Sequence, residues 1–355
     1  MAYLRTDNLF SMSGKGLRSA LSQSAAVATS IVVASGLFAP VAKAAPTLSQ
    51  IQAQVRQLEE DAASAAEGAQ AAKVQLATLT KTLNGIKQEA AAQGETVAAL
   101  KKSLGTIAIE QYKAGGLSQG LELLFSANPE LYLSSAGSLE SITRAKSTQL
   151  RKFEAAQQRL KATSLTVNDK LALVKAAQKK FAQKSAQAKA KLASAEKILA
   201  KLKKEDRARL AALAAAEEDA DQASSKAYAS SAGAISGRAG IAIRYALKQI
   251  GDRYVFGSAG TVTWDCSGLT MRAYQSAGVS LPHSSAAQSR YGRKVSYSSA
   301  RPGDLLFYGR PISHVAIYLG GGKMVHAPRP GSRVKVVSNA STALGRKKLV
   351  AVRRF

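Results

Sequence analysis

The feature that most constrains the fold is a run of apolar positions that recurs every three or four residues from Ile51 to Ile107. These positions carry Ile, Val, Leu or Ala, and only Gln93 interrupts them. Such spacing over this length indicates a long helix in a coiled coil rather than a globular-domain helix. Many of the positions are alanine, which allows close approach but buries little surface. We therefore expect a modestly stable helical hairpin over residues 45–221.

The first helical run ends in KAGGLSQGLELLFSANPELYLSS, where Gly115-Gly116 and Asn128-Pro129 break the helical pattern. This tip, near residues 115–135, is unusually apolar, so it is either a small cap folded on itself or a docking site for another protein. A second helical run, about residues 136–218, is expected to fold back antiparallel on the first. Its lysine-rich surface is interpreted as a solvated face.

The N-terminus predicts export. A polar leader with Lys15 and Arg18 precedes an apolar run at about 24–42, and Ala42-Lys43-Ala44 provides a small-x-small cleavage site. This order is typical of a secretory signal peptide, assigned here to residues 1–44; the alternative is an uncleaved membrane anchor. We expect a secreted protein that associates with the cell wall.

The chain is strongly basic, with a formal net charge of +27. From residue 237 onward 19 Lys and Arg face 3 Asp, or about +16 for the C-terminal part. Such a field attracts polyanions. Export and the lack of an aromatic-plus-basic RNA-binding motif argue against nucleic acid. Anionic wall polymers are the partners that fit best.

The C-terminal part has a different pattern. A Gly- and Ser-rich stretch, residues 222–238, predicts a flexible linker, and residues 239–355 are the right size for one compact domain. Two helical segments, around 238–251 and 265–279, precede five short apolar or alternating runs that predict an antiparallel sheet. The fold class is therefore α+β.

This domain contains Cys266, the only cysteine of the chain. A single thiol in an exported protein is a reactive group, an intermolecular link or a buried bystander. Asp265 is a plausible N-cap for the helix that starts at Cys266, and a helix N-terminus favours thiolate over thiol. These features predict a nucleophile.

A cysteine nucleophile needs an imidazole and a third group that orients the ring. The histidines of the chain are His283, His314 and His326, all in this domain. His314 opens one predicted strand, and His326 lies in the next strand, across a GGGK turn. That spacing allows the two rings to meet.

The segments YVFGSAGTVTWDCSGLTMRAYQSAGVSLPHSSAAQ, RPGDLLFYG, HVAIYLGGGKMVHAP and RVKV resemble the NlpC/P60 papain-like cell-wall peptidases. The resemblance implies that Cys266 is the nucleophile, His314 the general base and acid, and His326 the orienting residue. It places Tyr254, Asp265 and Ser267 at the substrate pocket and oxyanion site. Phe256 and Ser258 depart from the usual Tyr-x-Trp-Gly-Gly pattern, so pocket contacts follow less firmly than the triad.

The family cleaves stem peptides of peptidoglycan, typically between D-glutamate and the diamino acid, without a cofactor. The long coiled coil is similar to that of division-associated wall hydrolases, which a membrane complex resembling an ABC transporter activates. This second resemblance suggests that the hairpin restrains the active site until a partner engages the tip.

Other interpretations remain open at this point. Cys266 could be inert and buried, or could hold zinc with His314 and His326. His283 is interpreted as a loop residue rather than the base, and Asp304 as a turn residue rather than the third catalytic group. The whole chain could also be a non-catalytic wall-binding or division scaffold with a peptidase fold.

Overall fold

The computed structural model describes residues 46–113, 129–233 and 235–355, with residues 129–139 described by their backbone alone. The predicted signal peptide, 1–44, lies outside the described residues, as does the predicted apolar tip up to residue 128. In the parts of the chain that are described, no helix is both long and apolar enough to span a bilayer.

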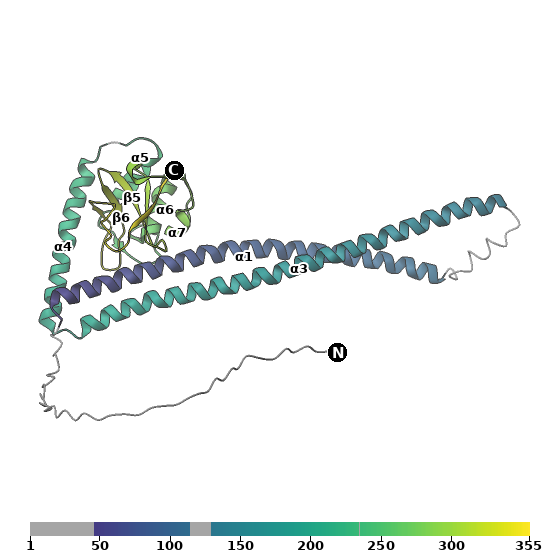
Figure 1. The fold of residues 1–355 in the computed structure, drawn as a ribbon, viewed down its shortest axis with the longest axis horizontal. Helices are drawn as coiled ribbons and strands as arrows, with labels where there is room; N and C mark the ends of the chain where they lie inside the picture. The colour runs from purple at the N-terminus through teal and green to yellow at the C-terminus, as the bar shows by residue number, and fades with distance from the viewer. Residues whose placement is uncertain (1–45, 114–128, 234) are drawn as a thin grey trace, which may run out of the picture. The chain divides into compact units, whose positions relative to one another are not determined.

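Two long helices form the predicted hairpin. Helix α1 spans Leu48–Lys113 and α3 spans Pro129–Ala200, and they pack against each other (Figure 1). Many of the buried positions on both helices are alanine, including Ala62, Ala69 and Ala188. Among the described residues of α1, none beyond Leu83 is fully buried, so the packing is concentrated in the N-terminal half of this helix.

The second helical run and the linker both differ from the prediction. Helix α3 ends at Ala200, and a separate helix, α4, spans Lys204–Ser231. The predicted linker, 222–238, is therefore helical up to residue 231. The cause is tertiary: Gln222 Nε2 donates to the carbonyl of Val334 over 3.2 Å, and Ser225 Oγ accepts from the N–H of Val336 over 2.9 Å. These bonds hold the end of α4, which is rich in small and polar side chains, against the edge of the sheet. The helix thereby protects the unpaired edge.

The C-terminal domain is α+β, as predicted. Its helices are α5 (Gly237–Leu247), α6 (Cys266–Ser276) and the short α7 (Ser285–Gln288). A six-stranded antiparallel sheet has the order β3-β8-β4-β5-β6-β7. Its strands are Arg293–Val295, Leu305–Tyr308, His314–Gly320, Lys323–His326, Lys335–Val337 and Leu349–Arg354, for β3 to β8 in chain order. The five predicted strands are present, and a further strand of the sheet that the sequence did not predict, β3, pairs with β8.

Short elements complete the domain. Strands β1 (Arg253–Tyr254) and β2 (Thr263–Trp264) form a two-stranded parallel pair ahead of α6, and a 3-10 turn spans Tyr297–Ser299. The first predicted helix of the domain is shorter than expected, because α5 ends at Leu247 rather than near Gly251.

Both faces of the sheet are buried, which is why β4 and β5 are apolar without alternation. On one face, Phe307, Val315 and Ile317 pack with Leu269 of α6. On the other face, a second cluster contains Leu306, Tyr308, Ala316 and Met324. The first cluster also includes Ala63 of α1, which is 3% exposed. The long hairpin thus contributes to the packing of the C-terminal domain beside α6.

Candidate active site

Cys266 is the first residue of α6 and is 2% exposed. Asp265 caps the helix as predicted, because its Oδ1 accepts from the N–H of Gly268 over 2.6 Å. The cap fixes the start of the helix and therefore the position of the thiol. The backbone N–H of Val315, in β5, also donates toward the sulfur.

His314 and His326 meet as the strand spacing predicts. His314 begins β5 and His326 ends β6, and the pairing of Ile317 with Val325 places them diagonally on the same face of the sheet. His314 Nε2 lies 2.9 Å from His326 Nδ1. With Nε2 engaged in this way, Nδ1 of His314 is the nitrogen left to exchange a proton with a thiol.

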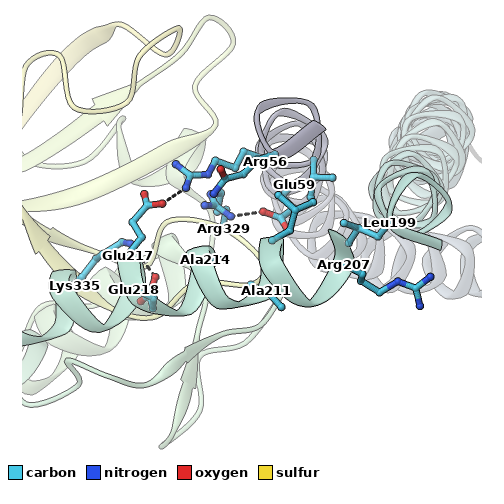
Figure 2. Close-up of a pocket in the computed structure, with 14 residues that line it drawn as sticks. Arg56, Glu59, Leu199, Arg207, Ala211, Ala214, Glu217, Glu218, Arg329 and Lys335 are labelled. Carbon is cyan, nitrogen blue, oxygen red and sulfur yellow. Dashed lines mark hydrogen bonds and ion pairs between the residues drawn. The ribbon is translucent and has the colours of Figure 1, made fainter. Parts of the chain in front are cut away.

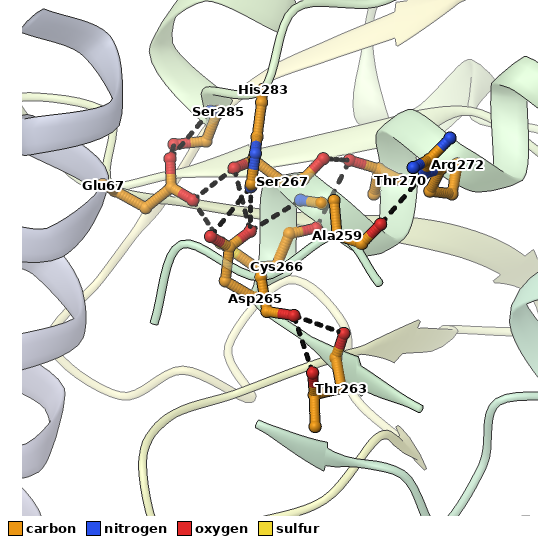
Figure 3. A network of polar contacts seen from close by, with 12 residues as sticks. Glu67, Ala259, Thr263, Asp265, Cys266, Ser267, Thr270, Arg272, His283 and Ser285 are labelled. Carbon is orange, nitrogen blue, oxygen red and sulfur yellow. Dashed lines mark hydrogen bonds and ion pairs between the residues drawn. The ribbon is translucent and has the colours of Figure 1, made fainter. Parts of the chain in front are cut away.

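A glutamate of the coiled coil occupies the site. Glu67 of α1 is 2% exposed, and its Oε1 accepts from Cys266 Sγ over 3.1 Å and from Ser267 Oγ over 2.6 Å (Figure 3). Its Oε2 accepts from the N–H and the hydroxyl of Ser285, over 2.8 Å and 2.7 Å. The carboxylate is therefore held by donors from both α6 and α7, directly beside the sulfur.

The thiol is protonated in this arrangement. Burial raises the pKa of Cys266 well above its usual value, and the charges of Glu67 and Asp265 raise it further. The sequence-based expectation that the helix N-terminus would favour the thiolate is therefore wrong for this conformation. The helix terminus is present, but burial under α1 and a neighbouring carboxylate outweigh it. The pKa of Glu67 is itself raised, first by burial and then by Asp265.

The two histidines are neutral. Burial lowers the pKa of His314 well below its usual value, and the charges of His326 and Lys347 lower it further. Burial, with Lys335 and Lys347, lowers the pKa of His326 to about 3. Proton transfer from Cys266 to His314 is thus unfavourable while α1 covers the site, since the donor is a weaker acid and the acceptor a weaker base than usual.

The predicted substrate residues surround the thiol. Tyr254 is 6% exposed, and its hydroxyl has no hydrogen-bond partner among the described residues. Its pKa is raised well above the usual range by burial and then by the charges of Cys266 and Asp265, which places it close to both. Ser267 is fully buried and bonded to Glu67 and Asp265. The structure therefore brings Tyr254, Asp265 and Ser267 together around Cys266.

The remaining candidates take structural positions. His283 Nε2 lies 2.9 Å from both carboxylate oxygens of Asp265. Burial opposes its protonation, but the hydrogen bond and charge of Asp265 outweigh burial and raise the pKa of His283. Asp304 accepts from the N–H of Arg301 and from the guanidinium of Arg354, as a turn residue would. No group of three metal-ligating side chains occurs within the described ranges, so the zinc interpretation gains no support.

The sequence did not predict the roles of Glu67 and Ser285, and it did not predict the contact between His283 and Asp265. A signal for Glu67 was present: from Ala62 to Ala72 every residue except Glu67 and Gln70 is Ala, Ser or Gly, and Gly68 is adjacent to the glutamate. A coiled coil needs apolar residues on one stripe of the helix, whereas a helix that packs closely between two partners has small residues on more than one side. Here Ala63 packs into the domain core, and Gly68 lies against Lys184 of α3.

Ion pairs also connect α1 and α4 to each other and to the C-terminal domain. A cavity of about 200 Å³ lies between α1, α4 and the loop after β6 (Figure 2). At this cavity, ion pairs connect α1 to both neighbours, namely Arg56 to Glu217 and Glu59 to Arg329. Lys335 of β7 contacts Glu218 over 3.0 Å and Asp221 over 2.7 Å, both on α4. We call these four pairs the clamp.

Comparison with known proteins identifies the domain. Residues 251–354 match the model of the NlpC/P60 family. The C-terminal domain is an NlpC/P60 domain. This range includes Cys266, His314 and His326, and it excludes α1 and α4, from which Glu67 and the clamp glutamates come.

Curated relatives match about a quarter of the chain. A protein of Mycobacterium tuberculosis named "Probable endopeptidase" is 45% identical over 95 residues, which cover 27% of this chain and 25% of that protein. The peptidoglycan endopeptidase RipA of the same species is 43% identical over 108 residues, covering 26% of this chain and 23% of that protein. The chain thus spans about a quarter of the relatives' length. Among solved structures, the peptidoglycan hydrolase RipB of Mycobacterium tuberculosis is 32% identical and covers 36% of this chain and 66% of that one, with a TM-score of 0.30.

Proposed function

We propose that this protein is a cysteine endopeptidase that hydrolyses stem peptides of peptidoglycan, and that α1 holds it inactive. The observation that carries the proposal is the contact of Glu67 with Cys266, in a domain that also brings His314 and His326 within hydrogen-bonding distance of each other. A thiol at the start of a helix, together with two hydrogen-bonded imidazoles, provides the catalytic groups of a cysteine peptidase. Glu67 comes from outside the domain and its carboxylate contacts that thiol, as expected of a group that restrains the active site.

The chemistry begins when α1 leaves. Without Glu67, Cys266 is a solvated thiol at a helix N-terminus, and its proton passes to His314 Nδ1. The thiolate attacks the amide carbonyl, and the oxyanion is held by backbone N–H groups near residue 266 and by the free hydroxyl of Tyr254. His314 then protonates the departing amine, and a water activated by the same ring hydrolyses the thioester. His326 keeps the His314 ring in the required orientation throughout.

The position of Glu67 suggests how the substrate binds. Ser267 and Ser285 hold the Glu67 carboxylate, so the same donors can hold a carboxylate of the substrate once α1 has left. A D-glutamate joined through its side chain keeps its α-carboxylate free beside the scissile amide. This fits the bond between D-glutamate and the diamino acid, the cleavage site that the family resemblance implies.

We place this activity outside the cell, at the wall, during remodelling or daughter-cell separation. The predicted signal peptide, residues 1–44, and the basic charge of residues 237–355 support this location. A division-associated membrane complex resembling an ABC transporter is the proposed partner, acting on the tip of the hairpin. Pulling α1 away from the domain would remove Glu67 and free the thiol.

The test uses the mature chain, residues 45–355, and purified peptidoglycan, with released fragments identified by mass spectrometry. Four proteins are compared: wild type, Glu67→Ala, Cys266→Ala and the double variant. We expect Glu67→Ala to release stem-peptide fragments faster than wild type, and both proteins with Cys266→Ala to release none. The fragments identify the bond.

Two results would contradict parts of the proposal. Equal release by wild type and Glu67→Ala would show that Glu67 does not restrain the enzyme, while the proposed endopeptidase activity would still hold. No Cys266-dependent fragments from Glu67→Ala, with the protein folded and bound to the wall, would replace the endopeptidase with the scaffold interpretation.

A further inference from the structure

A second acidic residue of α1 lies at the catalytic histidines. Glu60 is seven residues before Glu67, hence two helical turns and about 10 Å away on nearly the same face of α1. It lines a cavity of about 190 Å³ together with His314, His326 and Lys347. The helix therefore presents one carboxylate to Ser267 and Ser285 and another to the other end of the site.

Lys347 is the cation that faces this second carboxylate. Its side chain is half-buried and lines two cavities, both shared with Glu60. Burial lowers its pKa, whereas the charges of Cys266, Glu60 and Glu67 oppose that decrease. It lies close enough to both catalytic histidines to lower their pKa values.

The other cations of this cavity are already paired. Arg329 contacts Glu59, and Lys335 contacts Glu218 and Asp221. Among the described residues, no hydrogen bond or ion pair involves the Lys347 ammonium. Lys347 is therefore the cation available to a ligand once α1 has left.

His326 adds a second unmet donor. For His314 to accept the thiol proton at Nδ1, its Nε2–H must donate to Nδ1 of His326, which leaves a proton on Nε2 of His326. That Nε2 is buried without a hydrogen-bond partner in the described part of the chain, and His326 lines the same cavity. A free ammonium and a free N–H donor beside one cavity favour an anionic ligand there.

The reaction decides which half of the substrate enters this cavity. His314 must protonate the departing amine, so the leaving half lies beside His314, and the acyl half lies toward Ser267 and Ser285. We propose that Lys347 binds a free carboxylate on the leaving half of the substrate, at the place that Glu60 occupies in the closed chain. Lys347 is then a specificity-determining residue that distinguishes a free from an amidated diamino acid.

This inference rests on the proposed endopeptidase function and is tested in the mature Glu67→Ala chain. Two synthetic peptides, L-alanyl-γ-D-glutamyl-diaminopimelic acid with its diamino acid carboxylates either free or amidated, are compared by kcat/KM. We expect Lys347→Met to lower kcat/KM for the free acid by about tenfold or more, mainly through KM, because a hydrogen bond to a charged group is lost. The amidated peptide should change less than about twofold, within the scatter of surface substitutions.

Lys348→Met is the matched control, because Lys348 is adjacent in the chain and exposed; it should change neither peptide. Lys347→Arg should restore part of the preference for the free acid. An equal loss on both peptides, or no loss on either, would overturn the role of Lys347 while leaving the endopeptidase intact. Failure of the Glu67→Ala chain to cleave either peptide would instead overturn the proposed bond specificity and, with it, this inference.

Discussion

At the scale of single residues, the protonation of Cys266 separates the closed site from a working one. Glu67 blocks the thiol in space and also changes its acidity, because a buried carboxylate beside a thiol opposes formation of the thiolate. The lowered pKa of His314 acts in the same direction. The raised pKa of Cys266 and the lowered pKa of His314 both oppose formation of the thiolate, and Glu67 of α1 contributes directly to the first.

The acidity of Cys266 gives the first prediction. In the Glu67→Ala chain, alkylation of Cys266 by iodoacetamide should rise with pH at or below the ordinary thiol range of about 8.5, because the helix N-terminus and His314 favour the thiolate. In wild type the thiol pKa is raised, so the reaction should stay slow through that range and increase only at higher pH. Mass spectrometry measures the rate. In denaturant the two chains should react equally; a difference there, or equal rates in the folded proteins, would contradict the explanation.

The contact between His314 and His326 gives the second prediction. In the Glu67→Ala chain, His326→Ala should lower kcat on stem peptide by about 10- to 100-fold, as expected for a lost buried hydrogen bond of about 1–3 kcal/mol. His326→Asn should retain more activity, since its amide oxygen can accept from His314 Nε2–H. Equal losses in the two variants would show that the imidazole of His326 is needed for more than acceptance of that bond.

At the scale of elements, the close approach of α1 to the domain depends on small side chains. Ala63 is 3% exposed and packs into the cluster around α6. A larger side chain there would overpack this cluster, and overpacking a core typically costs about 1–3 kcal/mol. This cost applies to the closed arrangement alone, because the domain without α1 on it does not contain residue 63.

Ala63→Leu should therefore increase the open population by about tenfold, the factor that 1.4 kcal/mol gives. The change is measured as faster alkylation of Cys266 in the otherwise wild-type chain. Ala91→Leu, at an exposed position of the same helix, is the matched control and should leave the rate unchanged. An unchanged rate in Ala63→Leu, with the variant folded, would mean that α1 tolerates a larger side chain against the domain.

The elements also show where sequence reasoning succeeds. The strands around His314 and His326 were predictable, because Gly and Pro bound short apolar runs and a GGGK turn sets their pairing. The helix that continues to Ser231 was not predictable. Its Ser- and Ala-rich end has a weak helical pattern and is stabilised by Val334 and Val336, which lie more than a hundred residues later in the sequence.

At the scale of the whole molecule, the same limit applies to the site. Cys266, His314 and His326 lie in one domain with local patterns, so the sequence located them. Glu67 lies 199 residues from Cys266, and its role depends on how a helix docks onto a separately patterned domain. A pattern within either segment cannot specify that docking. The same limit applies to the charge. The net charge of +27 predicts attraction to polyanions, but it does not identify the ion pairs of the clamp.

The docking is held by contacts that cross between two parts of one chain, namely Glu67, Ala63 and the clamp, and covalent connection strengthens them. A short covalent connection gives an effective concentration of about millimolar. A specific protease site inserted after Gly233, which is exposed between α4 and α5, would remove that advantage after cleavage.

We expect the cut protein to remain inactive at high concentration and to become active on dilution, as the domain separates from the helices. The uncut protein should show the same low activity per molecule at every concentration. Stem-peptide hydrolysis across a dilution series measures both, and cut protein carrying Cys266→Ala is the control. Full activity immediately after cleavage, independent of concentration, would mean that Glu67 and the clamp are too weak to close the site and that the chain connection is the main restraint.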